Sequence, residues 1–175
     1  MPSRARRHPT TPREPPSPKL TYFEDRGTVL DAPLDVVWDF MQNDEKFHPR
    51  AHGSTLRNFK ARRLSEVSIR LRCEVRDGVG DGWRRMVARM TTIRPAMRVV
   101  EELEGELGGS KMVFLYTPRG KRTAVDIFCY MRSSTLSPTE IRRRTLASFA
   151  SAHREDLPFL RRYARQHPSK TGSRS

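Results

Sequence analysis

The fold of this chain is decided by the stretch Thr28-Val29-Leu30-Asp31-Ala32-Pro33-Leu34-Asp35-Val36-Val37-Trp38-Asp39-Phe40. Its first residues end a short strand-like segment that begins at Tyr22. Pro33 suits the first position of a helix, where its missing N–H costs no hydrogen bond. The apolar residues that follow are spaced i, i+3, i+4, i+7, as on one face of a helix: Leu34, Val37, Trp38 and Met41. The stretch therefore predicts a strand and then a short helix, and a second short helix is predicted around 44–52.

Working outward, residues 54–132 alternate apolar and polar side chains with a period of two, which predicts antiparallel strands with one buried face. Turn signals at 77–82, 94–95, 108–109 and 118–120 divide this region into about six strands. Ser137-Pro138-Thr139-Glu140 then forms a capping box that opens a long C-terminal helix. The predicted class is α+β.

This order of elements, together with the Ala-Pro and Val-Trp pairs quoted above, resembles the START-like, or SRPBCC, helix-grip superfamily over about residues 22–165. The resemblance, which is polyketide cyclase-like, implies a curved antiparallel sheet of about seven strands around a long C-terminal helix, with two short helices after the first strand. It also implies a deep, mostly apolar cavity between sheet and helix. Binding of lipids or other hydrophobic ligands, polyketide aromatisation and cyclisation, and non-haem iron chemistry all occur on this fold, which alone does not choose among them.

An apolar sheet face six strands wide exceeds what one helix covers, so the remainder is filled by large side chains or left as a pocket. The expected lining consists of inward-facing strand residues and one helical phenylalanine: Ile69, Leu71, Cys73, Met86, Met90, Phe114, Tyr116, Ile127 and Phe149. Trp83, which follows a turn at the sheet rim, is expected either as a lid over the cavity or as an ordinary edge aromatic. The alternative for the whole set is plain packed core.

Three histidines lie within the expected domain. His48 and His52 are four residues apart on the second short helix and share a face, and His153 and Asp156 share a face of the C-terminal helix. The stretches 43–52 and 155–160 more weakly resemble the segments that supply the iron ligands of Rieske oxygenase catalytic domains. That resemblance implies Fe(II) held by His48, His52 and Asp156, with Asp44 as a bridging carboxylate. No CxH or CxxC pair for a Rieske cluster is present, so electrons would have to come from another chain.

Other readings of the same residues remain open. His48, His52, His153 and Asp156 are candidates for a metal-free site that anchors a ligand or moves protons for it, and His48 also suits a helix cap beside Pro49. The main prediction is a protein that binds a small hydrophobic molecule, lipid-like or aromatic. The alternatives are a cyclase, dehydratase or iron oxygenase-like enzyme using His48, His52 and Asp156, and association of the chain's ends with nucleic acid or an anionic surface.

The charge of the chain is concentrated at its ends. The 175 residues carry 34 Lys and Arg against 20 Asp and Glu, a net charge of +14, and nine of these charges come from residues 1–19 and 161–175. We expect disordered basic tails at 1–19 and 167–175 around one domain at 20–166, because the tails hold too little apolar surface to fold. Nucleic acid is expected to bind only non-specifically, through these tails. The pairs and triplets of arginine inside the domain are expected on solvated faces, without the interleaved aromatic residues of a base-stacking surface.

The remaining composition excludes several classes of protein. The longest apolar run, Met112–Tyr116, is too short to cross a membrane, and no secretory signal begins the chain. Cys73 and Cys129 have neither zinc-ligand spacing nor a disulfide framework. The expectation is a reduced, cytoplasmic protein without a membrane span, and the sequence predicts no oligomeric state.

Overall fold

The computed structural model describes residues 18–42, 49–76, 79, 82–93 and 96–169. Its elements are β1 (Lys19–Leu30), α1 (Leu34–Gln42), β2 (Leu56–Arg63), β3 (Ser68–Arg76), β4 (Trp83–Ile93), β5 (Met97–Glu104), β6 (Lys111–Arg119), β7 (Arg122–Ser133) and α3 (Pro138–Gln166). All seven strands form one antiparallel sheet in the order β1-β7-β6-β5-β4-β3-β2. The predicted α+β helix-grip architecture is confirmed.

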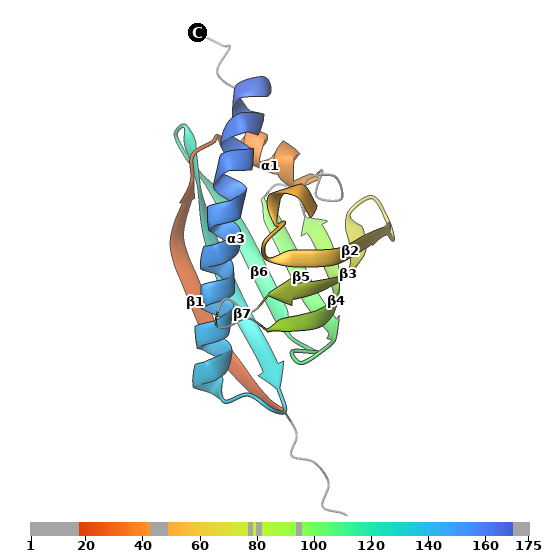
Figure 1. Cartoon of the computed structure of the whole chain (residues 1–175). Helices are drawn as coiled ribbons and strands as arrows, with labels where there is room; N and C mark the ends of the chain where they lie inside the picture. The colour runs from red at the N-terminus through yellow and green to blue at the C-terminus, as the bar shows by residue number, and fades with distance from the viewer. Residues whose placement is uncertain (1–17, 43–48, 77–78, 80–81, 94–95, 170–175) are drawn as a thin grey trace, which may run out of the picture.

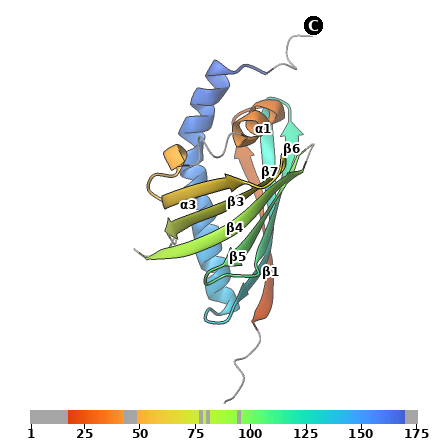
Figure 2. The same ribbon diagram turned by 90° about the vertical axis from the view of Figure 1, so that its right-hand side faces the viewer.

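The sheet is curved, and both α1 and α3 lie on its concave side (Figure 1). Viewed after a 90° turn, the strands stand in front of α3, and no described helix covers the convex face (Figure 2). The two faces therefore have different environments. The concave face holds the core, and the convex face meets solvent.

The segment that decides the fold behaves as its sequence predicts. The Val37 N–H donates to the Pro33 carbonyl at 3.0 Å, which closes the first turn of α1. Val36, Val37, Trp38 and Phe40 are buried in the main core. Burial of this apolar face is what holds the short helix against the sheet, since an isolated nine-residue helix is marginal in water.

The long helix α3 begins at the predicted cap. Ser137 accepts a hydrogen bond from the Glu140 N–H at 3.2 Å, and Pro138 occupies the first helical turn. The helix then continues through Pro158 to Gln166 without a break. Pro158 is exposed, so its ring projects into solvent, and the packed residues Leu160 and Tyr163 hold the last turns in place.

The second short helix and the tails are only partly described. Residues 49–51 are helical, while 43–48, including His48, lie outside the described residues. Of the expected tails, 1–17 and 170–175 also lie outside them, and Lys19 already pairs with Ser133 in β1. Within the described part of the chain, no helix combines the length and apolar character needed to span a bilayer.

Candidate ligand cavity

A cavity of about 240 Å³ lies between α3 and the concave face of the sheet. Its walls come from the end of α1, the turn before β2, the inner positions of strands β3 to β7 and one face of α3. The strand register explains the lining, because inner residues such as Phe114 on β6 stand on the same face as their cross-strand partners. Phe149 of α3 packs edge-on against Phe114 at the cavity wall, with ring centroids 6.1 Å apart.

Six of the ten residues predicted to line a cavity lie around this one: Leu71, Met86, Met90, Phe114, Tyr116 and Phe149. The other four lie elsewhere. Ile127 belongs to the main core, and Cys73 is buried with 2% of its surface exposed. Ile69 packs in a smaller cluster with Leu71 and Met90 and borders a separate, minor pocket.

Trp83 is on the opposite side of the sheet. It pairs in register with Arg76, an outward-facing residue of β3, and the Arg57 guanidinium lies over its ring at 4.3 Å. The lid interpretation is therefore wrong, and the edge-aromatic interpretation fits. The reason is strand parity: Trp83 alternates with inward-facing Arg84, which lines the cavity.

The sequence interpretation missed nineteen lining residues, which lie on α1, in the turn before β2, on strands β2 to β7, in the loops and on α3. Part of this set could have been predicted from the alternation of inward and outward residues along β5 and from the helical spacing of apolar residues along α3. The missed residues are Phe40, Met41, Ala51, Thr55, Leu56, Val75, Arg84, Arg98, Val100, Glu106, Leu107, Met112, Met131, Leu136, Ile141, Arg144, Thr145, Ser148 and Ala152.

The best-defined polar cluster at the cavity surrounds His52. This side chain is 3% exposed and lies between two carboxylates of α3: its Nδ1 is 3.2 Å from Glu155 Oε2, and its Nε2 is 3.0 Å from Asp156 Oδ1. The Thr55 hydroxyl donates to the Glu155 carboxylate at 2.6 Å, and the Ser54 hydroxyl donates to it as well. These contacts fasten the turn before β2 to α3 at the cavity wall.

The same contacts set the charge states of this His52 cluster. Burial lowers the pKa of His52, but the hydrogen bond and charge of Asp156, together with those of Glu155, outweigh burial, so the pKa lies above its usual value. Burial raises the pKa of Glu155, while hydrogen bonds from Ser54 and Thr55 and the charge of His52 lower it below its usual value. The protonated imidazole and the ionised carboxylate thus favour each other.

The candidate iron set is brought together only in part. His52 and Asp156 are in contact, whereas His48 and Asp44 lie outside the described residues. Among the residues that the structure describes, no group of three or more His, Cys, Asp or Glu side chains is arranged to hold a metal ion. Two ligands do not make the facial triad, so Fe(II) at this site stays a prediction that depends on His48.

His153 does not line the cavity. It lies near Asp31, whose pKa is lowered chiefly by the Arg161 hydrogen bond and to a smaller extent by the charges of Arg122 and His153. The one-residue helical step from Ala152, which does line the cavity, turns His153 away from it.

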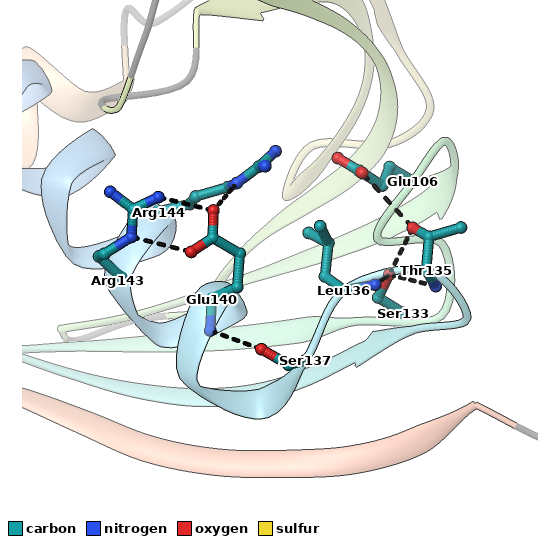
Figure 3. A network of polar contacts seen from close by, with 8 residues as sticks. All are labelled: Glu106, Ser133, Thr135, Leu136, Ser137, Glu140, Arg143 and Arg144. Atoms are coloured by element: carbon teal, nitrogen blue, oxygen red, sulfur yellow. Dashed lines mark hydrogen bonds and ion pairs between the residues drawn. The ribbon is translucent and has the colours of Figure 1, made fainter.

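Other charged side chains at or near the cavity are also held by partners. The Arg84 guanidinium donates to Glu102 at 2.6 Å, and burial raises the pKa of Glu102 even though Arg84 and the Leu107 N–H lower it. In Figure 3, Arg143 and Arg144 both reach Glu140 at the start of α3, and Thr135 donates to Glu106. Arg84, Arg144 and Glu106 add polar groups to a cavity whose remaining lining is mostly apolar.

No protein-family model and no curated protein matches the sequence. Solved structures do match. The Zhui aromatase/cyclase from Streptomyces sp. R1128 is 15% identical, with 88% of this chain and 99% of that chain covered and a TM-score of 0.64. The di-domain aromatase/cyclase BexL is 16% identical, with 85% and 51% covered and a TM-score of 0.63, so this chain spans about half of its length.

A third similar structure is norcoclaurine synthase from Thalictrum flavum in complex with dopamine and hydroxybenzaldehyde. It is 14% identical, with 95% of this chain and 100% of that chain covered and a TM-score of 0.58. A START superfamily protein from Mycobacterium smegmatis is 14% identical, with 80% and 99% covered and a TM-score of 0.60. At these identities the comparisons establish the fold. This chain therefore has the START-like, helix-grip fold, and polyketide aromatase/cyclases are among the solved structures that share it.

Proposed function

We propose that this protein binds a small hydrophobic molecule in the cavity between α3 and the sheet. The observation that carries the proposal is the cavity of about 240 Å³ with its largely apolar lining. A dry cavity of about 150 Å³ already takes up benzene, so this one has room for a fused-ring or branched molecule. Aromatic side chains at its walls, including Phe114 and Phe149, favour an aromatic ligand.

The polar side chains at the cavity predict a second property of the ligand, which is polar substituents. His52 and Asp156 stand at one wall and Arg84 and Arg144 at others, so an apolar body with polar substituents satisfies the cavity better than a pure hydrocarbon. These groups already bond to protein partners, but a guanidinium has five N–H donors and a carboxylate has several acceptor sites, so a ligand oxygen or nitrogen can bond to the capacity that remains. Norcoclaurine synthase, which shares the fold, was solved with an aromatic amine and an aromatic aldehyde, and this supports the same class of ligand.

The experiment is titration with the uncharged fluorescent probe phenylnaphthylamine, whose emission rises in an apolar site. Ala152→Phe adds a ring to the cavity lining, and Ala150→Phe adds the same ring to the exposed face of the same helix. We expect the first variant to lose probe binding and the second to retain it. Equal binding by the two variants would place the probe outside the cavity and contradict the proposal.

A second candidate function is acid–base catalysis of a cyclisation or dehydration. It is favoured by the contact between His52 and Asp156 at the cavity wall, where the protonated imidazole is a proton donor and the carboxylate a proton acceptor. The aromatase/cyclases among the similar structures support it. The test is incubation with a linear polyketone thioester, in which a product lighter by one water is sought by mass spectrometry. His52→Gln should abolish that product while phenylnaphthylamine still binds.

A further inference from the structure

The convex face of the sheet carries a pattern that the cavity does not explain. Register pairing aligns one row of side chains across all seven strands, and no described helix covers it (Figure 2). In strand order from β2 to β1, this convex row is Arg62, Arg70, Arg89, Glu101, Lys111, Tyr130 and Tyr22. With strands about 4.8 Å apart, the row is roughly 29 Å long.

The half of this face over β2, β3 and β4 is strongly basic. Among the described residues, the outward positions of these strands hold eight basic side chains: Arg57, Lys60, Arg62, Arg70, Arg72, Arg76, Arg85 and Arg89. Three carboxylates accompany them, Glu74 bound to Arg57, Glu104 to Arg70 and Glu101 to Arg89. Counted over these described residues alone, five positive charges remain in excess.

Several of these charges face one another directly. Arg62 is the register partner of Arg70, Arg70 is the partner of Arg89, and Lys60 is the partner of Arg72. Like charges on directly opposed residues destabilise a sheet. Lys60, Arg62, Arg72 and Arg85 form no ion pair with any residue that the structure describes. A polyanion bound on this face would therefore reduce the repulsion between the basic side chains and would itself be attracted to them.

The other end of the convex row is aromatic. Tyr22 and Tyr130 stand side by side with ring centroids 5.1 Å apart, and they are 50% and 40% exposed. Phe128 lies on the same face of β7, with the Arg26 guanidinium 5.2 Å from its ring centre. Exposed rings beside a basic groove or face are the arrangement on which the bases of single strands stack.

We propose that the convex face binds single-stranded nucleic acid, with phosphates on the arginines of β2 to β4 and bases against Tyr22 and Tyr130. An anionic bilayer would also attract the arginines, so the test below includes vesicles. The pair of exposed rings at the far end of the same row is what favours stacked bases. Folding brings Tyr22 and Tyr130 together from the first and the last strand, which is why the sequence shows no interleaved aromatic residues. This site lies on the opposite face of the sheet from the cavity.

The test is fluorescence anisotropy of a labelled oligothymidylate of about 20 nucleotides with the full chain, across a series of salt concentrations. The face variant Arg62→Gln/Arg72→Gln/Arg85→Gln removes three of the charges that lack an ion-pair partner, one from each strand. We expect its affinity to fall about tenfold or more, and the slope of log affinity against log salt to become shallower by roughly 2, as three lost phosphate contacts require. Its melting temperature should stay level or rise, since repulsion within the sheet is relieved.

Two matched variants remove the same charge elsewhere. Arg142→Gln/Arg154→Gln/Arg165→Gln lies on exposed positions of α3, and Arg4→Gln/Arg6→Gln/Arg7→Gln lies in the N-terminal segment outside the described residues. Both should leave affinity within about twofold of the parent at moderate salt, because they remove no contact on the convex face. Equal losses in all three variants, or a loss in the N-terminal variant alone, would overturn the proposal.

The aromatic end of the row has its own test. Tyr130→Leu should weaken oligothymidylate binding and leave heparin binding unchanged, because heparin has no bases to stack, and Tyr130→Phe should restore the oligonucleotide affinity. Binding to vesicles containing phosphatidylserine without binding to the oligonucleotide would assign the face to membranes and refute the nucleic-acid proposal. The face variant should still bind phenylnaphthylamine, so this outcome is independent of the cavity.

Discussion

At the scale of single residues, His52 combines two contacts that a surface histidine lacks. Both of its ring nitrogens lie within hydrogen-bonding distance of a carboxylate, and the side chain is almost fully buried. Burial alone would favour the neutral imidazole, whereas two flanking carboxylates favour the charged one. The effect of the carboxylates exceeds that of burial, so the pKa of His52 is raised and the charged imidazole is favoured in the contact that joins the turn before β2 to α3.

This balance predicts a pH dependence of stability. The folded-state pKa of His52 is raised, so its contribution is complete below the ordinary value of 6.5 and is lost as pH rises through the raised pKa. The folded-state pKa of Glu155 is lowered, so its contribution is complete above the ordinary value of 4.5 and is lost as pH falls through the lowered pKa. The His52 cluster should therefore stabilise the fold most between these two values.

Urea denaturation at pH 5.5 and pH 9 measures the effect. We expect His52→Gln to lower the free energy of unfolding by about 1–3 kcal/mol at the lower pH, as for hydrogen bonds to charged groups, and by clearly less at the higher pH. His153→Gln, which lies on α3 outside the cavity lining, is the matched control and should show a smaller difference between the two pH values. A His52 effect that is the same at both pH values would mean that the contact is not charge-dependent.

Gly105 is the residue where backbone geometry is most restrictive. Its φ of +124° suits glycine, and a Cβ there would lie 2.7 Å from the Arg85 carbonyl oxygen and 3.0 Å from Glu102 Oε1. Any side chain would therefore push against the strand that carries Arg85 and against the buried carboxylate that holds Arg84.

Gly105→Ala should lower the free energy of unfolding by about 2 kcal/mol or more, from positive-φ strain and the close contact together. Gly53→Ala serves as the comparison, because a Cβ at Gly53 meets nothing within 4 Å. Thermal denaturation followed by circular dichroism measures both. Similar melting temperatures for the two variants would show that the turn after β5 adjusts without cost.

At the scale of elements, the stability of α3 depends on the N-cap that its sequence predicts. The Ser137 hydroxyl accepts a hydrogen bond from the Glu140 N–H, and the Glu140 carboxylate accepts hydrogen bonds from Arg143 and Arg144 (Figure 3). Ser137→Ala should cost about 1 kcal/mol, the usual value of a lost N-cap, and Ser137→Asp should cost much less. Chemical denaturation decides between these values, and an equal loss for Asp and Ala would mean that the hydroxyl contact does not cap the helix.

Elements with a strong local signal were predictable. The Ala-Pro and Val-Trp segment, the Ser137 cap and the alternation of β3 each encode their own structure, and all three are present. Only the Ser137 half of the predicted capping box is confirmed, because the Glu140 carboxylate accepts hydrogen bonds from Arg143 and Arg144. The cavity lining was predictable only where the inward parity was clear, as at Leu71, Phe114 and Tyr116. The sequence left two placements open for Trp83 because this residue begins a strand after a turn, where one residue of register decides which face it occupies.

The His52 cluster shows why a site is harder to predict than a fold. His52 and Glu155 are separated by 103 positions, and only the docking of α3 on the sheet brings them together. The stretch containing Glu155 and Asp156 signalled an acidic helix segment, but nothing local shows that Glu155 reaches Ser54 and Thr55. Strand and helix signals are short-range, whereas the geometry of a site is a product of long-range packing.

At the scale of the whole molecule, the sheet separates two environments. The concave side encloses the apolar cavity under α3, while the convex side presents the basic and aromatic row. The net charge of +14 is thus not carried by the chain ends alone, since one face of the domain holds a cluster of its own. A ligand in the cavity and a polyanion on the convex face would contact different residues of the same strands.

Ligand binding in the cavity should stabilise the whole domain, because a molecule that binds only the folded state shifts the unfolding equilibrium by mass action. At phenylnaphthylamine concentrations about 100 times its dissociation constant, the gain is about 2.7 kcal/mol, or roughly 5–10 °C in melting temperature for a chain of this size. Differential scanning calorimetry should show this rise for the parent and for Ala150→Phe, and none for Ala152→Phe, whose added ring occupies the space. If the probe raises all three melting temperatures equally, it binds elsewhere on the surface, and the cavity would then be a feature of packing rather than the ligand site.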